Sequence, residues 1–172
     1  VIFKENFSVM ILEVFMSQEY VGYYETSVGI IRILCDENYV LEVGFSSEKE
    51  KNTDGSIVLD NALKQIDEYF KGKRKLFDLP LYFNGTDFQK SVWKALTEIP
   101  YGEVVSYQDI AKKINNEKAV RAVGNANNRN KIMIMIPCHR VIGKNGKLVG
   151  FAGGLDKKEF LLAHEKETNN KG

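Results

Sequence analysis

The first half of the sequence consists of short apolar and β-branched runs separated by polar breaks. Runs rich in Val, Ile, Tyr and Phe predict four strands of an antiparallel meander, at residues 10–15, 18–24, 28–34 and 39–45. The period then changes, and apolar residues recur at helical spacing at Leu59, Leu63, Ile66 and Phe70. This spacing predicts a helix over residues 57–70 that stops at Gly72, and the polar segment 71–84 predicts a linker.

Two helix starts are marked in the second half of the sequence. Thr86, with Gln89 three residues later, has the sequence of a capping box and predicts an amphipathic helix that ends at Pro100. Ser106 opens a second, shorter helix, whose inner face consists of Ile110, Ala111 and Ile114. Both helices therefore have an apolar side to bury.

A third helix is predicted over residues 118–130, where Ala, Val and Gly allow close approach to a neighbouring surface. Arg121, Asn125 and Arg129 recur every four residues, so they share one side of this helix. Two short helices of which the second carries cationic and amide side chains predict a helix-turn-helix, which many DNA-binding proteins use. Helical hairpins that never touch DNA have the same pattern, so the pattern alone leaves both interpretations open.

The last part of the sequence predicts a strand, a hairpin and a final helix. The apolar run 132–136 is too short for a helix and predicts a buried strand that Pro137 ends. The runs 140–142 and 148–149 flank a Gly- and Asn-containing turn at 143–146, which indicates a hairpin. Asp156 with Glu159 predicts the start of a helix that continues through residue 165, before a frayed tail at 166–172.

The composition is that of an ordinary globular protein with one large or two small domains. The chain has 172 residues, of which 44% are hydrophobic and 27% charged. No apolar stretch is long enough to cross a bilayer, and residues 1–20 lack the features of a signal peptide, so we expect a cytoplasmic protein that does not bind membranes.

The charge is divided unevenly along the chain. Residues 1–85 contain 9 Lys and Arg against 14 Asp and Glu, whereas residues 86–172 contain 15 against 9. The halves therefore carry net charges of −5 and +6, which indicates that the second half meets a polyanion. Two solvated surfaces of different charge would have the same composition.

The candidate chemistry centres on one of two cysteines. Cys35 and Cys138 have no partners at CxxC spacing, which argues against a disulfide framework and a Cys-rich zinc cluster. Cys35 ends an apolar run and is expected to be a small buried hydrophobe. Cys138 adjoins His139, whose imidazole could take the proton of the thiol. Because neighbours on an extended chain point to opposite sides, this transfer needs a turn or, as we favour, a bridging water.

The last helix offers a carboxylate to orient His139. Glu165 follows Leu161 and Leu162 on the same helix face and should have a partner if that face is buried, and Lys158 lies on this face too. Each residue also has an ordinary explanation: His139 as a surface turn residue, Glu165 as an exposed helix end, and Tyr107 as an aromatic packed on the core. A metal site would need carboxylates, because the chain has only two His and two Cys.

Several motifs resemble the O6-alkylguanine-DNA alkyltransferase (methylated-DNA-protein-cysteine methyltransferase) family. The central motif is Ile136-Pro137-Cys138-His139-Arg140-Val141, followed by Gly153-Gly154-Leu155 and Leu161-Leu162-Ala163-His164-Glu165. Upstream, the matching positions are Phe88-Gln89, Val92-Trp93, Pro100-Tyr101-Gly102-Glu103-Val104, Ser106-Tyr107, Arg121-Ala122-Val123-Gly124 and Asn130. The resemblance covers nearly all of residues 86–165, whereas the first half matches only in length and in its strands-then-helix pattern.

The resemblance implies an α+β protein with two domains. Residues 1–78 would form a ribonuclease H-like support domain, an antiparallel sheet with a helix. Residues 79–172 would form a winged-helix-like helical domain with the helix-turn-helix, which binds DNA and transfers the alkyl group. The implied activity is DNA repair by one irreversible transfer of an alkyl group from guanine O6 to Cys138, without a cofactor. The implied partner is double-stranded DNA containing O6-alkylguanine, and we expect a monomer.

The resemblance also implies roles for individual residues. Cys138 attacks the alkyl carbon, and its proton leaves through a water, His139 and Glu165. Tyr107 and Lys158 help guanine to leave, and Asn130 tethers the turns around the site. On the DNA side, Arg121 fills the gap left by a flipped nucleotide. The other expected DNA contacts are Tyr107, Ala119, Ala122, Gly124, Asn125 and Arg129, and the expected substrate pocket consists of Pro137, Val141, Phe151, Ala152 and Gly153.

Some positions depart from the family, and two other functions remain open. Phe151 and Ala152 stand where many members carry tyrosine and serine, which puts side-chain contacts from this loop in doubt. Some members hold a structural zinc in the first domain, but no His and only one Cys precede residue 86, so we expect none here. The alternatives are a module that binds alkylated DNA without repairing it, which would lack the cysteine, and a Cys-His hydrolase with multiple turnovers.

Overall fold

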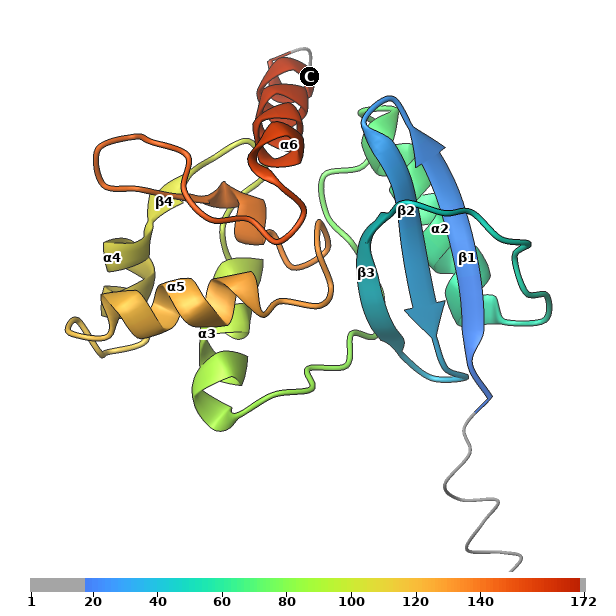
Figure 1. Cartoon of the computed structure of the whole chain (residues 1–172), viewed down its shortest axis with the longest axis horizontal. Helices are drawn as coiled ribbons and strands as arrows, with labels where there is room; N and C mark the ends of the chain where they lie inside the picture. The colour runs from blue at the N-terminus through green and yellow to red at the C-terminus, as the bar shows by residue number, and fades with distance from the viewer. Residues whose placement is uncertain (1–17, 171–172) are drawn as a thin grey trace, which may run out of the picture.

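The computed structural model describes residues 18–170, in which a small sheet and a group of helices lie side by side. Figure 1 shows the sheet with one helix, α2, against one face, and the remaining helices on the other side of strand β3. The α+β class predicted from the sequence is confirmed. The strand expected at residues 10–15 lies outside the described residues.

The sheet is antiparallel in the order β1 (Tyr20–Thr26), β2 (Gly29–Cys35) and β3 (Val40–Ser46). Tyr20 pairs with Cys35 across the first ladder, and Ile31 pairs with Phe45 across the second. Side chains alternate between the faces, so Ile31, Ile33 and Cys35 point into the core, where each is fully buried. The three described strands of the meander were predicted correctly, and Cys35 is the buried hydrophobe expected. Its burial raises the pKa of the thiol to about 12.

Helix α2 (Ile57–Phe70) has the predicted bounds. Its first turn is capped by Ser56, whose side chain accepts a hydrogen bond from the Leu59 amide. The segment 71–84 has no helix, as predicted for a linker, but it is packed along the sheet. Tyr82 N donates to Val40 O at 2.9 Å and Val40 N donates to Pro80 O at 2.8 Å, so this connection borders β3.

The helical part begins with the three predicted helices. Helix α3 (Asp87–Thr97) has both hydrogen bonds of the Thr86–Gln89 capping box, and α4 (Tyr107–Lys113) is capped in the same way by Ser106 with Asp109. Helix α5 (Val120–Asn128) packs against both of them. The α4–α5 pair is the predicted helix-turn-helix, with α5 shorter at each end than expected.

The apolar run 132–136 is not the buried strand that its composition predicted. Ile134 has a φ of 72°, a left-handed conformation that breaks an extended chain, and Ile136 N donates back to Ile132 O at 2.9 Å. The run is a tight turn between the sheet and the helices, and it is apolar because both sides bury it. A short apolar run therefore predicts that its side chains are buried, but it does not predict that the backbone is extended.

The predicted hairpin at 140–149 is also wrong, although its turn is present. Gly143 N donates to Lys147 O and Gly146 N donates to Gly143 O, both at 2.9 Å. However, β5 (Val141–Ile142) pairs in parallel with β4 (Val105–Ser106) rather than with residues 148–149. The partner of β5 is therefore β4, which is distant in sequence, and not the nearby residues 148–149.

Helix α6 (Leu155–Asn169) is longer than predicted at both ends. The N-cap residue is Gly154, which has no side chain to cap the helix. Asp156 therefore lies inside the first turn and does not form a capping box with Glu159. Its last turn, expected to be frayed, is ordered because Thr168 Oγ1 lies 2.6 Å from the Tyr101 hydroxyl. This helix brings its side chains to the centre of the molecule.

Candidate active site

Cys138 lies in a single helical turn, η1 (Cys138–Arg140), which follows Pro137. The side chain is 2% exposed, and its sulfur accepts a hydrogen bond from Asn130 Nδ2 at 3.1 Å. Burial raises the pKa of the Cys138 thiol to about 11, while the Asn130 hydrogen bond and the charge of Lys158 act in the opposite direction. The thiol is therefore protonated at neutral pH and needs a base before it can react.

Asn130 connects the two ends of the turn that precedes Cys138. Its Nδ2 donates to Ile136 O at 2.8 Å, and its Oδ1 accepts from Ile132 N at 2.9 Å. These bonds hold the ends of the 132–136 turn, where Ile132 also forms an isolated parallel bridge with Val43. The position of the Cys138 sulfur therefore depends on one buried amide.

His139 is the base nearest in sequence to Cys138, and it is completely buried. Its Nε2 lies 2.7 Å from Glu165 Oε1, whereas Nδ1 has no hydrogen-bond partner among the described residues. Burial lowers the pKa of His139 below its usual 6.5, although Glu165 acts in the opposite direction. The neutral imidazole is thus favoured, with one ring nitrogen oriented by Glu165 and the other available to receive a proton.

Glu165 is fully buried and accepts five hydrogen bonds. Oε1 accepts from Tyr69 OH at 2.8 Å, His139 Nε2 at 2.7 Å and Arg140 Nη2 at 3.0 Å. Oε2 accepts from Arg140 Nε at 2.8 Å and from Gly102 N at 3.1 Å. Burial alone would raise the pKa of Glu165, but His139 and Arg140 outweigh it and hold this pKa well below its usual range.

Gly102 can reach Glu165 only because it is glycine. Its φ is 78°, and a Cβ at this position would lie 2.9 Å from Asn169 Nδ2. Gly102, in the loop between α3 and β4, therefore supplies a backbone amide to the buried carboxylate.

Lys158 and Tyr107 hold the loop that follows β5. Lys158 Nζ donates to Val141 O at 2.6 Å and Val149 O at 2.9 Å, and Tyr107 OH donates to the same Val149 O at 2.9 Å. Burial lowers the pKa of Lys158 to about 8. The Lys158 ammonium lies 6.0 Å from the centroid of the Tyr107 ring, so the structure brings these two expected site residues together.

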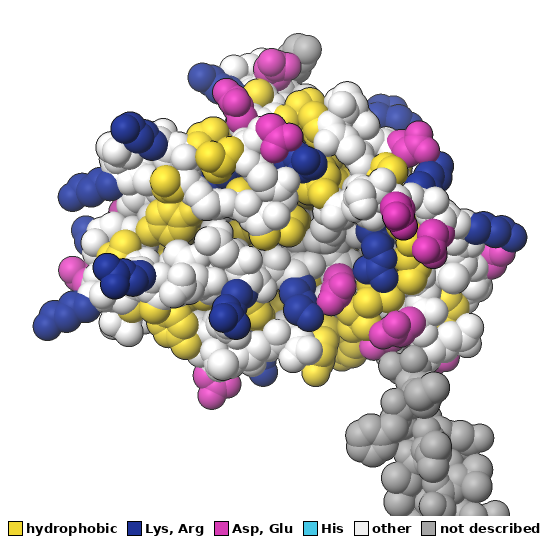
Figure 2. Space-filling model, viewed as in Figure 1, with side chains coloured by type: hydrophobic (Ala, Val, Ile, Leu, Met, Phe, Trp, Pro, Cys, Tyr) yellow, Lys and Arg dark blue, Asp and Glu magenta, His cyan; other side chains and the backbone are white. Residues whose placement is uncertain are grey.

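The expected DNA-facing residues lie along the outer side of α5. Arg121, Ala122, Asn125 and Arg129 are exposed, while Ala119 and Gly124 are partly buried. Figure 2 shows Lys and Arg side chains spread over the part of the molecule that holds α4 and α5, whereas side chains of both charges lie on the side of the sheet. On this face, the region of α4 and α5 is therefore the more basic one.

The expected pocket residues lie in two places. Pro137 and Val141 are buried beside Cys138 in the chain. In the 151–153 loop, Phe151 is buried and Ala152 exposed, and a Cβ at Gly153 would lie 2.7 Å from the Phe151 ring. Close packing on an aromatic ring therefore requires glycine at position 153.

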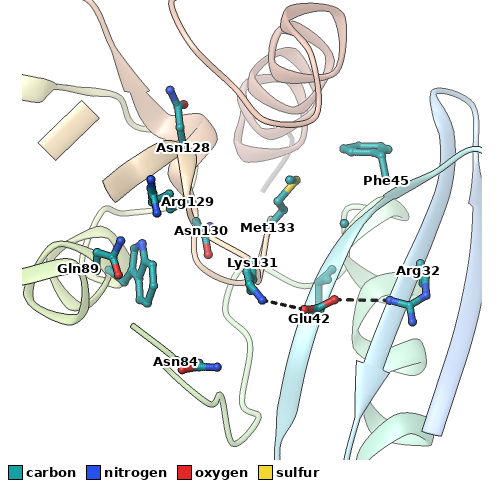
Figure 3. Close-up of a pocket in the computed structure, with 13 residues that line it drawn as sticks. Arg32, Glu42, Phe45, Asn84, Gln89, Asn128, Arg129, Asn130, Lys131 and Met133 are labelled. Carbon is teal, nitrogen blue, oxygen red and sulfur yellow. Dashed lines mark hydrogen bonds and ion pairs between the residues drawn. The ribbon is translucent and has the colours of Figure 1, made fainter. Parts of the chain in front are cut away.

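A groove of about 580 Å³ separates β3 from the end of α5 (Figure 3). Glu42 lies between Arg32 and Lys131 in this groove, at 3.6 Å and 3.2 Å. Asn130 lines it, but Cys138 does not. Backbone bonds close the inner side of the groove, since Val43 N donates to Lys131 O and Met133 N donates to Val43 O, both at 2.8 Å.

His139 is not a surface turn residue and Glu165 is not an exposed helix end, because both side chains are fully buried and hydrogen-bonded to each other. Sequence reasoning missed Tyr69, Gly102 and the role of Arg140. Arg140 could have been found, because a buried carboxylate needs a cation and Arg140 adjoins His139. Tyr69 carries no such signal, because its hydroxyl approaches from 96 residues away.

Within residues 18–170, no group of three or more His, Cys, Asp or Glu is arranged to hold a metal ion. In the same part of the chain, no helix is long and apolar enough to cross a membrane.

A buried thiol, a histidine and an orienting carboxylate define a protein that uses cysteine as a nucleophile, here beside a helix-turn-helix. Two family models match the chain: the ribonuclease-like domain of 6-O-methylguanine DNA methyltransferase over residues 20–85, and the DNA binding domain of the same family over residues 87–167. The chain therefore belongs to the 6-O-methylguanine DNA methyltransferase family.

Individual relatives agree with this assignment over most of their length. The methylated-DNA–protein-cysteine methyltransferase of Methanosarcina acetivorans is 51% identical, over 85% of this chain and 97% of that protein. The constitutive methyltransferase of Bacillus subtilis is 47% identical, over 83% and 92%. Among solved structures, the O6-methylguanine methyltransferase of Mycobacterium tuberculosis has a TM-score of 0.79 at 37% identity, over 88% and 94%. The M. tuberculosis protein in complex with DNA has a TM-score of 0.78 at 39% identity, over 85% and 92%.

Proposed function

We propose that this protein repairs DNA by moving a methyl or other alkyl group from guanine O6 to Cys138, once per chain. The observation that carries the proposal is a pair of buried contacts at adjacent residues, Asn130 with the Cys138 sulfur and His139 with Glu165. A bond forms between the Cys138 sulfur and the alkyl carbon as the bond from that carbon to O6 breaks. The product is a thioether, and because nothing in the site reverses it, the reaction ends after one turnover.

Proton movement explains why a thiol with a raised pKa can react. The Cys138 proton passes to His139 Nδ1, and we propose that a water carries it, because the two residues are neighbours on the chain. Glu165 stabilises the imidazolium that results through the contact at Nε2. The departing guanine takes up a proton, and we assign its stabilisation to Tyr107 and Lys158, which lie together next to the loop after β5.

Access to the alkyl carbon requires the damaged nucleotide to leave the DNA stack. We propose that α5 lies in the minor groove, where sequence readout is weak, and that Arg121 fills the gap left in the duplex. Its exposed position in the first turn of α5 supports this role. The remaining expected contacts, with Asn125 and Arg129 among them, lie toward the phosphate backbone.

Several finer features belong to the same proposal. We infer a domain boundary near residues 78 and 79, a monomer acting on duplex DNA, and a cytoplasmic location where a chromosome is in direct reach. The reaction needs no cofactor. Repair of O4-alkylthymine would use the same thiol, since it also presents an alkyl carbon bonded to a ring oxygen.

The decisive experiment is mass spectrometry after incubation with an oligonucleotide containing O6-methylguanine. We expect one added methyl group on the peptide with Cys138 and none on Cys35, the internal control. An unalkylated protein that still binds the oligonucleotide would make it a binding module instead. Release of more than one equivalent of product per chain would make it a hydrolase. Cys138→Ala should abolish transfer and retain DNA affinity.

The DNA role is tested by Arg121→Ala beside Arg129→Ala, a second exposed arginine of the same helix segment. A fluorescent base analogue opposite the lesion measures flipping, and a binding titration measures affinity. We expect Arg121→Ala to reduce flipping and repair rate more than binding, and Arg129→Ala to reduce binding and its salt dependence. An unchanged repair rate in Arg121→Ala would refute the assignment.

A further inference from the structure

Tyr69 joins the sheet-bearing part of the protein to the proton relay. It lies in the last turn of α2, its side chain is fully buried, and its hydroxyl donates to Glu165 Oε1 at 2.8 Å. The adjacent residue of α6, His164, contacts the Tyr69 carbonyl through Nε2 at 2.8 Å. Helix α6 therefore contacts Tyr69 at two points, its side-chain hydroxyl and its backbone carbonyl.

The oxygen that Tyr69 contacts is the oxygen that orients His139. Oε1 receives the Tyr69 hydroxyl at 2.8 Å and the His139 ring at 2.7 Å. A carboxylate oxygen that already accepts a hydrogen bond has less electron density for a second donor, so it is a weaker base toward that donor. Tyr69 consequently affects His139 without touching it.

We propose that Tyr69 is a positioning residue of the relay, which holds the Glu165 carboxylate in place and weakens its pull on the His139 proton. The inference rests on the proposed function, in which neutral His139 accepts the proton of Cys138. It also assigns the first part of the chain a share in the chemistry. A relay built only from residues after position 86 would lack this hydroxyl.

Burial keeps the Tyr69 hydroxyl a donor. Its pKa is raised well above 10, first by burial and then by the Glu165 charge, so the phenol stays neutral at any pH where the relay works. Other titratable or charged groups also face this cluster. They are Cys138, Arg140, Lys158, Tyr101, His164 and, above the Tyr101 ring, Lys75.

The test compares the pH dependence of alkyl transfer in Tyr69→Phe and Tyr101→Phe. Both variants remove one hydroxyl and keep the ring, and the two rings lie 5.9 Å apart. The Tyr101 hydroxyl contacts Thr168 and not Glu165, so it is a matched control. Transfer falls at acid pH as His139 becomes protonated. Because Tyr69→Phe removes one of five donors to Glu165, we expect the midpoint of this fall to rise by about half a pH unit.

Tyr101→Phe should leave the midpoint at its original pH. A midpoint in Tyr69→Phe equal to that of the unmodified protein overturns the inference, even if the transfer rate has fallen, because packing damage lowers a rate without moving a titration. In a Glu165→Gln background, the effect of Tyr69→Phe on the midpoint should vanish.

The inference can also be separated from the proposed function. The ring titration of His139, followed by nuclear magnetic resonance in the free protein, needs no DNA and should show the same upward shift in Tyr69→Phe. If the unmodified protein transfers no alkyl group, the proposed function fails while this titration still decides the role of Tyr69. If Tyr69→Phe does not fold, the test is the nuclear magnetic resonance signal of the Tyr69 hydroxyl proton in the unmodified protein. This proton should exchange slowly with water and give a cross-peak to the His139 ring. Rapid exchange and no cross-peak would refute the contact between Tyr69 and Glu165.

Discussion

Replacement of Arg140 should show most clearly how much the buried ion pair with Glu165 stabilises the protein. Its side chain is 5% exposed, and it meets Glu165 through Nε at 2.8 Å and Nη2 at 3.0 Å. Nη1 donates to Ile99 O at 2.7 Å. Arg140→Ala leaves the fully buried Glu165 charge without its counterion, a change that typically destabilises a protein by about 3–5 kcal/mol.

This cost can be measured as a change in thermal and urea unfolding. For a chain of this length each kcal/mol moves the melting temperature by about 2–4 °C, so we expect a fall of roughly 10 °C. Arg74→Ala is the matched control, because Arg74 also forms a 2.7 Å pair with a glutamate, Glu68, but with both side chains 26% exposed. Solvent screening limits such a pair to about 0–1 kcal/mol.

Equal losses in the two variants would refute the argument that burial gives the Arg140 pair its importance. The double variant Arg140→Ala with Glu165→Gln supplies a further check, because it removes the uncompensated charge. It should recover part of the stability lost in Arg140→Ala alone. A double variant whose loss equals the sum of the two single losses would show that the pair is not coupled.

Three further outcomes follow from the site. Asn130→Ala should raise the pKa of Cys138, because it removes a hydrogen bond to the sulfur, and thiolate absorbance during a pH titration measures this. Gly102→Ala and Gly146→Ala both place alanine at a φ near 78°, but only Gly102 would meet a side chain, so its melting temperature should fall further. Because the folded pKa of Glu165 lies below its usual 4.5, its contribution to stability is present above pH 4.5 and is lost as the pH falls below that value, which urea unfolding between pH 3 and 6 would detect.

The sequence allowed the regular elements to be predicted well. Helix starts with capping residues, such as Thr86 and Ser106, were found to the residue because the cap is a local interaction. The errors lie where a distant contact decides the conformation. Residues 132–136 turn instead of extending because Asn130 and Val43 hold them, and β5 pairs with Val105 rather than with its neighbour in sequence.

The candidate site shows the same division between local and distant contacts. The contact between His139 and Glu165 could be anticipated, because a helix face buried beside two leucines requires a partner for its carboxylate. Tyr69 could not be anticipated. It was not among the residues of the apolar face predicted for α2, and the direction of its hydroxyl depends on how α6 lies against α2, which no local pattern specifies.

The place of Glu165 in the sequence has a consequence for synthesis. A ribosome makes Cys138 and His139 before it makes α6, so an unfinished chain has the thiol without the carboxylate that orients its base. Such a nascent chain holds the reactive atom in an unassembled site. If each thiol reacts only once, as proposed, a chain that reacted before α6 was made would have no thiol left when its relay was assembled.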